Sequence, residues 1–289
     1  MKRCPYCGSI EYFEFKILSR IFHQCQECDL ICRSIQEDYK KVLNTYSSGE
    51  YFDIHSFDQT DGKRDKLYNH ILDSITQKKD SGSLLDVGTG SGFFLAAAQK
   101  RGWFVKGIEP SVDSARVAKR QNNLDVFIGT LQEYSGNERF DVITFINVLD
   151  HSAEPWKEIE RANDLLKPNG ILYLRFPNGL LHTNLYQIAS QMGLASQIQK
   201  FLVFHQFPFT LKFIQRLLSD SGFSDIIILN SQPSEGDPHN LFFAPTFAQY
   251  VKKAIYLIAQ IIRIFSYEKI LVGTSLEVIA VKRPFLAKY

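Results

Sequence analysis

Leu84-Leu85-Asp86-Val87-Gly88-Thr89-Gly90-Ser91-Gly92 is the stretch that decides the fold of this 289-residue chain. Its apolar residues lead into one acidic residue, three glycines then alternate with small hydroxyl residues, and an apolar helical pattern begins at Phe93. This order predicts a buried strand, a tight turn and a helix start, because glycine permits positive φ angles and leaves bare backbone beside a ligand. The third glycine of a dinucleotide-binding G-x-G-x-x-G motif would fall on Phe93, which argues against a nicotinamide site. Taken alone, the turn is equally compatible with an ordinary strand-to-helix loop.

Strand and helix patterns alternate along the rest of the chain. This alternation predicts a doubly wound, Rossmann-like α/β fold with a seven-stranded, mostly parallel sheet. Ligands of such sheets bind in a crevice at the carboxyl ends of the strands. The last strand is expected at the sheet edge, and residues 167–170 are expected to form a turn. Strands are expected at 84–87, 103–108, 126–128, 140–146, 171–176, 226–229 and 276–282, and helices at 63–77, 93–98, 112–121, 158–166, 180–205, 210–219 and 244–266.

Cysteine is confined to the first 32 residues, as two C-x-x-C pairs with Cys32 left over. The pairs are Cys4 with Cys7 and Cys25 with Cys28. Two such pairs match the four-thiolate pattern of a structural zinc site, so we expect a small zinc-ribbon module in residues 1–35. A segment of this length buries too little apolar surface to fold alone, and a bound metal would supply the missing energy. Iron, disulfides or reactive thiols are the alternatives, and a cytosolic setting disfavours the last two.

The remaining chain divides into a connector and a larger domain. Residues 36–80 are expected to hold a connector and an N-terminal helix, and residues 81–289 the main domain, with helical insertions at about 180–205 and 244–268. Within the connector, Tyr39 to Asp61 is either a lid over the crevice or a plain linker. The 244–266 helix is basic and amphipathic. Its apolar stripe predicts packing against its own domain or a partner chain, with peripheral membrane contact as the alternative.

Composition restricts the partners that the chain can have. A formal net charge of +2 gives no broad basic field, so we expect no nucleic-acid binding. The start, Met1 to Pro5, has no apolar signal segment, and the apolar run Ala254 to Ile262 is too short to span a bilayer. We therefore expect a cytoplasmic protein, with a membrane-peripheral location as the alternative. An oligomer is compatible with this sequence.

Four segments together resemble the class I S-adenosylmethionine-dependent methyltransferases, in the group of ubiquinone-type O-methyltransferases and methyltransferase types 11, 12 and 23. They occur in the family's order over roughly two thirds of the chain. The segments are 84–92, 107–111, 140–151, and 165–170 with Pro177-Asn178 after it.

This resemblance implies that S-adenosylmethionine is the cofactor. It places Glu109 against the ribose hydroxyls, and Asp86 either at the turn or against the ammonium group of the cofactor. Thr130 and Leu131, with Gln132, stand where the adenine is held, although an Asp common in relatives is absent. The residues implied to bind the cofactor are Asp86, Gly88, Thr89, Gly90, Gly92, Glu109, Pro110, Thr130, Leu131, Asn147 and Val148.

Two histidines are candidates for the base that removes a proton from the methyl acceptor. His205 precedes Phe207-Pro208-Phe209-Thr210-Leu211, a stretch similar to the His-containing segment of related sugar and quinone methyltransferases. His151 follows the strand 140–146, and we expect it to form a wall of the site. We expect His205 to act as the base, against the background that a lone histidine is more often structural.

The acceptor is expected to be a small organic molecule: a sugar, a lipid-linked glycan precursor or a quinone-like ring. Aromatic, apolar residues above the crevice, among them Phe207 and Phe209, suit such an acceptor. Cysteine-rich ribbons precede the methyltransferase domain both in deoxysugar C-methyltransferases and in some rRNA guanine methyltransferases. An RNA methyltransferase that binds its substrate through the ribbon is therefore one alternative. A non-catalytic scaffold that binds the cofactor is the other.

Overall fold

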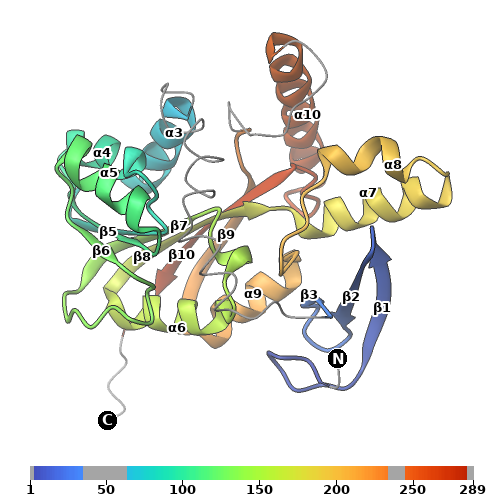
Figure 1. Cartoon of the computed structure of the whole chain (residues 1–289), viewed down its shortest axis with the longest axis horizontal. Helices are drawn as coiled ribbons and strands as arrows, with labels where there is room; N and C mark the ends of the chain where they lie inside the picture. Colours follow the sequence, from blue (N-terminus) through green and yellow to red (C-terminus); the bar gives the residue numbers. More distant parts are fainter. Residues whose placement is uncertain (1–2, 35–63, 234–244, 285–289) are drawn as a thin grey trace.

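A seven-stranded sheet forms the centre of the molecule, and the computed structural model describes residues 3–34, 64–233 and 245–284 (Figure 1). From edge to edge its strands follow the order β6, β5, β4, β7, β8, β10, β9. The first five run parallel to one another, whereas β10 is antiparallel to both of its neighbours. The predicted seven-stranded, mostly parallel sheet is confirmed. The strands are β4 (Ser83–Val87), β5 (Phe104–Glu109), β6 (Val126–Ile128), β7 (Phe140–Ile146), β8 (Leu166–Pro177), β9 (Phe223–Asn230) and β10 (Ser275–Lys282).

The last strand does not lie at the edge of the sheet, so that prediction is wrong. β10 lies between β8 and β9, and β9 forms the edge. Leu276, Val278 and Ala280 of β10 are buried on one face and Ile279 on the other. A strand that is apolar on both faces belongs inside a sheet. In β9, by contrast, Ile227 is exposed.

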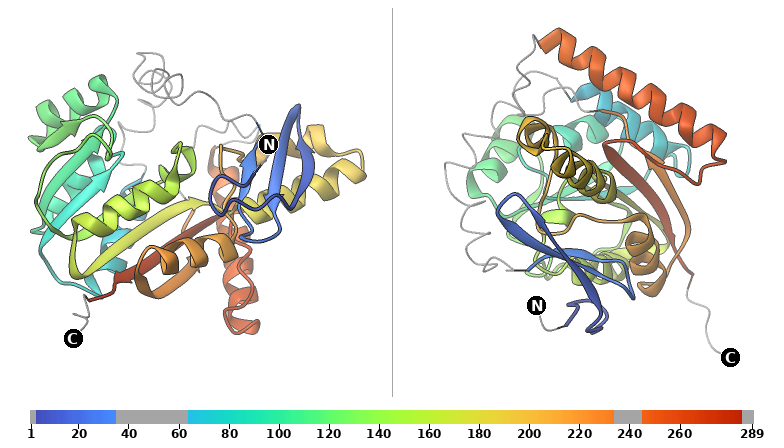
Figure 2. Two further views of the ribbon diagram at one scale, coloured as in Figure 1. Left: turned by 90° about the horizontal axis from the view of Figure 1, so that it is seen from below. Right: turned by 90° about the vertical axis from the view of Figure 1, so that its right-hand side faces the viewer.

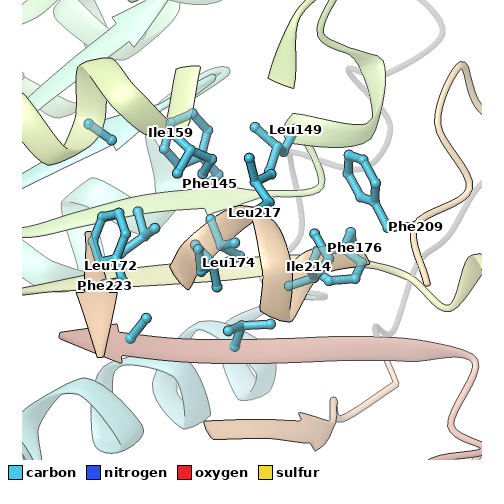
Figure 3. Close-up of a cluster of buried hydrophobic side chains, with 14 of the residues drawn as sticks. Phe145, Leu149, Ile159, Leu172, Leu174, Phe176, Phe209, Ile214, Leu217 and Phe223 are labelled. Atoms are coloured by element: carbon cyan, nitrogen blue, oxygen red, sulfur yellow. The ribbon is translucent and has the colours of Figure 1, made fainter. Parts of the chain in front are cut away.

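Helices cover both faces of the sheet, as a doubly wound fold requires (Figures 1 and 2). α3, α4 and α5 pack on one face, where Val142 of β7 is buried, and α6 and α9 pack on the other. Figure 3 shows Phe145 and Leu174 of the sheet with Ile159 of α6 and Leu217 of α9 in this second core. The helices are α3 (Asp65–Thr76), α4 (Phe93–Lys100), α5 (Val112–Asn122), α6 (Pro155–Leu165), α7 (Gly179–Gln191), α8 (Ala195–Ile198), α9 (Leu211–Asp220) and α10 (Pro245–Phe265), with the 3₁₀ turns η1 (Leu149–His151) and η2 (Gln199–Phe201).

The turn expected at 167–170 lies inside β8 as a local irregularity. Phe140 pairs with Leu166 and Val142 with Ile171, so Asp141 alone lies opposite residues 167–170. Asn169 takes a left-handed φ of 59° there. The turn residues therefore bulge the strand instead of ending it.

The two helical insertions have different surroundings. The first consists of α7, α8 and η2 in place of one continuous helix over 180–205. The second is α10. Three residues of its apolar stripe, Ile255, Ile258 and Phe265, are exposed and do not pack on the described part of its own domain. The inner side of α10 makes polar contacts instead. Asn230 Nδ2 donates to the carbonyl of Ala259 at 3.0 Å, and these contacts turn the apolar residues outward.

The cysteine-rich segment forms a separate antiparallel sheet that docks on α7 and α9. Tyr6 Oη donates to Asp220 Oδ2 at 2.6 Å, Thr210 Oγ1 donates to the carbonyl of Asp29 at 3.1 Å, and the Leu18 N–H donates to Tyr186 Oη at 2.8 Å. The domain boundaries at residues 35 and 80 stay predictions, as does the lid at Tyr39 to Asp61, which lies outside the described residues. The strands of this small sheet are β1 (Tyr12–Ile17), β2 (Arg20–Cys25) and β3 (Ile31–Arg33).

Asp141 joins the start of β7 to β4 and to the irregular part of β8. Its Oδ2 accepts from the Ser83 N–H and hydroxyl, both at 2.9 Å. Lys79 Nζ lies 2.8 Å from Oδ1, and Lys167 Nζ lies 2.7 Å from Oδ2. Burial alone would raise the pKa of Asp141, but these hydrogen bonds hold it well below its usual range. The carboxylate thus stabilises the fold only while it is ionised.

We expect Asp141→Asn to lower the free energy of unfolding by about 1–3 kcal/mol at neutral pH. Because the folded-state pKa is depressed, this contribution is present above the unfolded-state value of about 4 and is lost as the pH falls below it. Urea unfolding of wild type and variant at neutral and acidic pH checks this. A difference in stability that does not shrink in acid would contradict it.

Candidate functional site

The glycine turn after β4 is held in a form that only glycine takes easily. Gly88, Gly90 and Gly92 have φ angles of 73°, 57° and 79°. A Cβ at Gly88 would collide with Val148 Cγ2, so this position also lacks room for a side chain. The N–H groups of Gly88 and Thr89 donate to the Ile108 carbonyl at 2.8 and 3.1 Å, which ties the turn to β5.

Glu109 ends β5 with a buried carboxylate that faces this turn. Oε2 accepts from the Gly90 N–H and Oε1 from the Ser111 N–H, each at 2.8 Å. Burial raises the pKa of Glu109, and the two N–H donors oppose that rise. Each carboxylate oxygen accepts about two hydrogen bonds, so both oxygens retain capacity for hydroxyl donors of a ligand.

Asp86 lies on the neighbouring strand as a second buried acid. Thr144 Oγ1 donates to its Oδ1 at 2.6 Å. Burial raises the pKa of Asp86 to about 7, and the nearby Glu109 charge adds to the rise. A carboxyl group with a pKa near neutrality favours a cationic partner, because a positive charge stabilises its ionised form.

Pro110, Thr130 and Leu131 complete this side of the edge. Pro110 follows Glu109 directly, and Gly129 donates to the Glu109 carbonyl at 3.1 Å, so the segment after β6 adjoins the end of β5. The Thr130 N–H and hydroxyl both donate to Glu133 Oε2, at 2.8 and 2.9 Å, while Leu131 is buried.

Asn147 and Val148 close the edge at the end of β7. Asn147 has a left-handed φ of 58°, a conformation that asparagine tolerates better than most residues. Its Oδ1 accepts from Arg175 Nη1 at 2.5 Å. Arg175 Nε donates to Ser231 Oγ at 2.9 Å, so the guanidinium is fixed on both sides.

The two histidines lie together beyond Val148. The ring centroids of His151 and His205 are 3.7 Å apart, and His205 Nδ1 forms a hydrogen bond with Asp150 Oδ2. Asp150 is buried, and burial alone would raise its pKa, but the nearby histidines hold that pKa below its usual value. The hydrogen bond to Asp150 makes Nδ1 the protonated nitrogen of a neutral His205, which leaves Nε2 to accept a proton. The ligand atoms of these three residues lie within 4.8 Å of one another, a spacing that could also hold a metal ion.

The predicted site residues thus form one continuous edge. Gly90 contacts Glu109, Val148 abuts Gly88, and the His151 N–H donates to the Val148 carbonyl at 3.0 Å. In the sheet, β4 lies between β5 and β7, so the segments that follow these three strands are neighbours at their carboxyl ends.

Two buried charged residues at this edge escaped prediction from the sequence. Arg175 interrupts the apolar run 171–176, and a charge placed in a buried strand requires partners, which was the available signal. Asp150 directly precedes His151 in the sequence, but nothing in the sequence predicts its hydrogen bond with His205.

The four paired cysteines converge within the small N-terminal sheet module. Cys4 Sγ lies 3.6 Å from Cys28 Sγ, and Cys7 Sγ lies 3.5 Å from Cys25 Sγ, with all four sulfurs within 4.8 Å of one another. Sulfurs about 2.3 Å from a tetrahedral zinc ion are about 3.8 Å apart, so this donor set fits zinc. The contact between Cys4 and Cys28 lowers the pKa of the first thiol and raises that of the second, so without a metal the two sulfurs share a proton.

Comparison with known proteins places this arrangement in context. A family model described as a methyltransferase domain matches residues 60–227, more than half of the chain. The ubiquinone biosynthesis O-methyltransferase of Histophilus somni is 31% identical over 150 residues, which are 47% of this chain and 60% of that protein. That of Pasteurella multocida is 31% identical over 163 residues, 50% of this chain and 64% of that protein. The chain spans less than two thirds of the length of these relatives.

Solved structures share the fold at low sequence identity. A SAM-dependent methyltransferase from Archaeoglobus fulgidus gives a TM-score of 0.52 at 16% identity, covering 81% of this chain and 100% of that one. The magnesium protoporphyrin IX methyltransferase of Synechocystis, solved with bound SAH, gives 0.53 at 15% identity, covering 85% and 100%. At these identities the likeness concerns the fold alone.

Proposed function

Since the chain belongs to the family of methyltransferase domains, we propose that it transfers a methyl group from S-adenosylmethionine to a small organic acceptor. The observation that carries the proposal is the buried Glu109 carboxylate at the end of β5, held against the N–H of Gly90 in the glycine turn. The two hydroxyls of a ribose are good donors to a carboxylate at the end of this strand. Phe93, in place of the third glycine of the dinucleotide-binding motif, argues against a nicotinamide dinucleotide as the owner of that ribose.

Different residues of the edge bind different parts of the cofactor. Glu109 accepts from the ribose hydroxyls, with Pro110 beside it. Asp86 and the backbone of the glycine turn receive the amino-acid end of the cofactor. Thr130 and Leu131 adjoin the adenine, and Asn147 and Val148 flank the centre of reaction. S-adenosylmethionine supplies a methyl group on a sulfonium that is already activated, so alignment by these residues provides most of the acceleration.

The acceptor must lose a proton, and His205 is the residue we assign to that step. With Nδ1 hydrogen-bonded to Asp150, Nε2 takes the proton from the acceptor, and Asp150 stabilises the imidazolium that forms. His151, whose ring lies tilted against the His205 ring, forms a wall of the site. We favour this role over metal binding by the same three residues because the hydrogen bond already occupies one atom of His205 and one of Asp150.

An oxygen atom on a quinone-like ring is the acceptor class we favour. Its support is the similarity of the chain to ubiquinone biosynthesis O-methyltransferases. A sugar or lipid-linked glycan precursor is the next class. The net charge of +2 gives no support to an RNA acceptor.

We further propose that Cys4, Cys7, Cys25 and Cys28 bind one structural zinc ion. Its support is the close convergence of the four sulfurs, and the ion would stabilise the three-stranded module through its thiolates.

Glu109→Ala should weaken binding of S-adenosylmethionine at least tenfold, or by about 1.4 kcal/mol, because the ribose hydroxyls lose their acceptor. Calorimetric titration with S-adenosylmethionine and S-adenosylhomocysteine measures this. Asp113→Ala, at a partly exposed acid three residues past Pro110, is the matched control and should bind as wild type does. Folded, zinc-loaded wild type that binds neither compound would refute the proposal, whereas binding without turnover on any acceptor would favour a scaffold.

His205→Asn should lower the rate of methyl transfer by about 100-fold or more, because the acceptor keeps its proton. Cofactor affinity should stay within about twofold. Asp150→Asn should also slow transfer, since an amide in place of the carboxylate can stabilise the wrong histidine tautomer. Release of S-adenosylhomocysteine with a panel of phenols, nucleotide sugars and RNA reports the rates and the acceptor class. A His205→Asn enzyme as fast as wild type would eliminate His205 as the base.

Cys28→Ser should remove the bound zinc and lower the melting temperature. The fifth cysteine provides the control: Cys32→Ala should keep zinc, because Cys32 lies outside the group of four sulfurs. Metal analysis of the purified proteins, together with thermal unfolding, measures both effects. Wild type without zinc, or equal metal loss in the two variants, would contradict the assignment.

A further inference from the structure

The outer side of α10 carries a strip of apolar side chains. Leu257, Ile261 and Ile264 are 62%, 54% and 63% exposed, and Ile258 and Phe265 are 56% and 80% exposed. At about 100° per residue these positions fall on one side of the helix. Figure 1 shows α10 rising away from the sheet, and the right-hand view of Figure 2 shows it along the outside of the molecule.

The inner side of the same helix is the more polar one. Ala259 is buried, and its carbonyl accepts from Asn230. Gln260 Nε2 donates to the Asn230 carbonyl at 3.5 Å. A helix that covers a core turns its apolar side inward. α10 does the reverse, because its polar side faces the sheet and its apolar side is exposed. A continuous apolar strip in this orientation marks an interaction surface.

The charges around the strip indicate what it binds. Between Tyr250 and Ile270 the sequence holds four basic residues and a single acid, Glu268; the basic residues are Lys252, Lys253, Arg263 and Lys269. A second copy of this chain is a poor partner for this surface. Pairing of two copies through this strip would bring one predominantly basic surface against another, which like charges disfavour.

A bilayer with anionic headgroups suits both the charge and the shape. Exposed tyrosines flank the strip, Tyr250 at 71% and Tyr267 at 87%, and phenol side chains are favoured at the level of the headgroups. No helix in the described part of the chain has the length and apolarity to cross a membrane. A helix with this pattern lies in the plane of the bilayer surface.

We propose that α10 docks flat on an anionic lipid bilayer, with Leu257, Ile261 and Ile264 entering the acyl boundary and Lys253 and Lys269 at the lipid phosphates. This contact does not rest on the proposed methyl transfer. Its test is the binding of the protein to lipid, which is measured without any methyl acceptor.

Co-sedimentation of the full chain with lipid vesicles tests the proposal. Wild type should bind vesicles of phosphatidylcholine mixed with phosphatidylglycerol, and should bind pure phosphatidylcholine vesicles or high-salt mixtures more weakly. The triple variant Leu257→Gln/Ile261→Gln/Ile264→Gln should lose at least about tenfold in partition coefficient. The matched control is Leu185→Gln/Ile188→Gln/Met192→Gln, on α7 and at the residue that follows its last turn. These side chains are also exposed, and the control should bind as wild type does.

Failure of wild type to bind the anionic vesicles would overturn the proposal, as would equal losses in the two triple variants. Light scattering without lipid separates the second-copy alternative: a wild-type dimer that the α10 variant dissociates would also overturn it. Lys253→Glu/Lys269→Glu gives a check that does not alter the apolar strip. It should reduce binding to anionic vesicles, with thermal unfolding unchanged, and unchanged lipid binding would remove the anionic preference from the proposal.

Discussion

The tie between the glycine turn and the end of β5 is the contact on which the carboxyl edge of the sheet depends. The N–H groups of Gly88 and Gly90 donate to Ile108 and Glu109 across it. Their left-handed φ angles would cost a residue with a Cβ about 1–2 kcal/mol each. The turn and the carboxylate specify each other, because buried N–H groups require acceptors and a buried carboxylate requires donors. Backbone N–H groups therefore fix the position of the Glu109 carboxylate, in addition to the conformation of the side chain itself.

The cysteine-rich module reaches this edge through the chain that carries His205. The Arg33 N–H donates to the Gln206 carbonyl at 3.1 Å, and the Phe207 N–H donates to the Asp150 carbonyl at 3.3 Å. The segment next to His205 is thus held by the module on one side and by Asp150 on the other. A metal that stabilises the module would also restrict the position of the imidazole, although it lies outside the reacting site.

The strands and the mostly parallel sheet could be predicted from the sequence, whereas the order of the last two strands and the contacts between distant segments could not. β7 begins and ends where its apolar run does, because a strand buried on both faces leaves a continuous signal. The place of β10 depends instead on strand pairing across the chain, which periodicity does not encode. The outward direction of α10 is decided by its contacts with Asn230, and the pair of Asp150 and His205 by the docking of the segment before α9. The glycine turn and Glu109 were accessible because strand ends bring them together in any parallel sheet.

β8 and β10 bury a cluster of polar and charged side chains in a part of the sheet where apolar side chains would be expected. Arg175 lies opposite Glu277 in the strand register, Tyr173 Oη donates to Glu277 Oε2 at 3.0 Å, and His70 of α3 lies 3.1 Å from Oε1. The hydrogen bond with Glu277 is the largest cause that raises the pKa of His70. Apolar side chains could fill such a space at equal or better stability. The polar groups instead fix the orientation of a side chain. Arg175, which faces Glu277, also donates to the side-chain amide of Asn147. Through this chain of contacts, α3 and β10 help to orient Asn147 at the carboxyl edge.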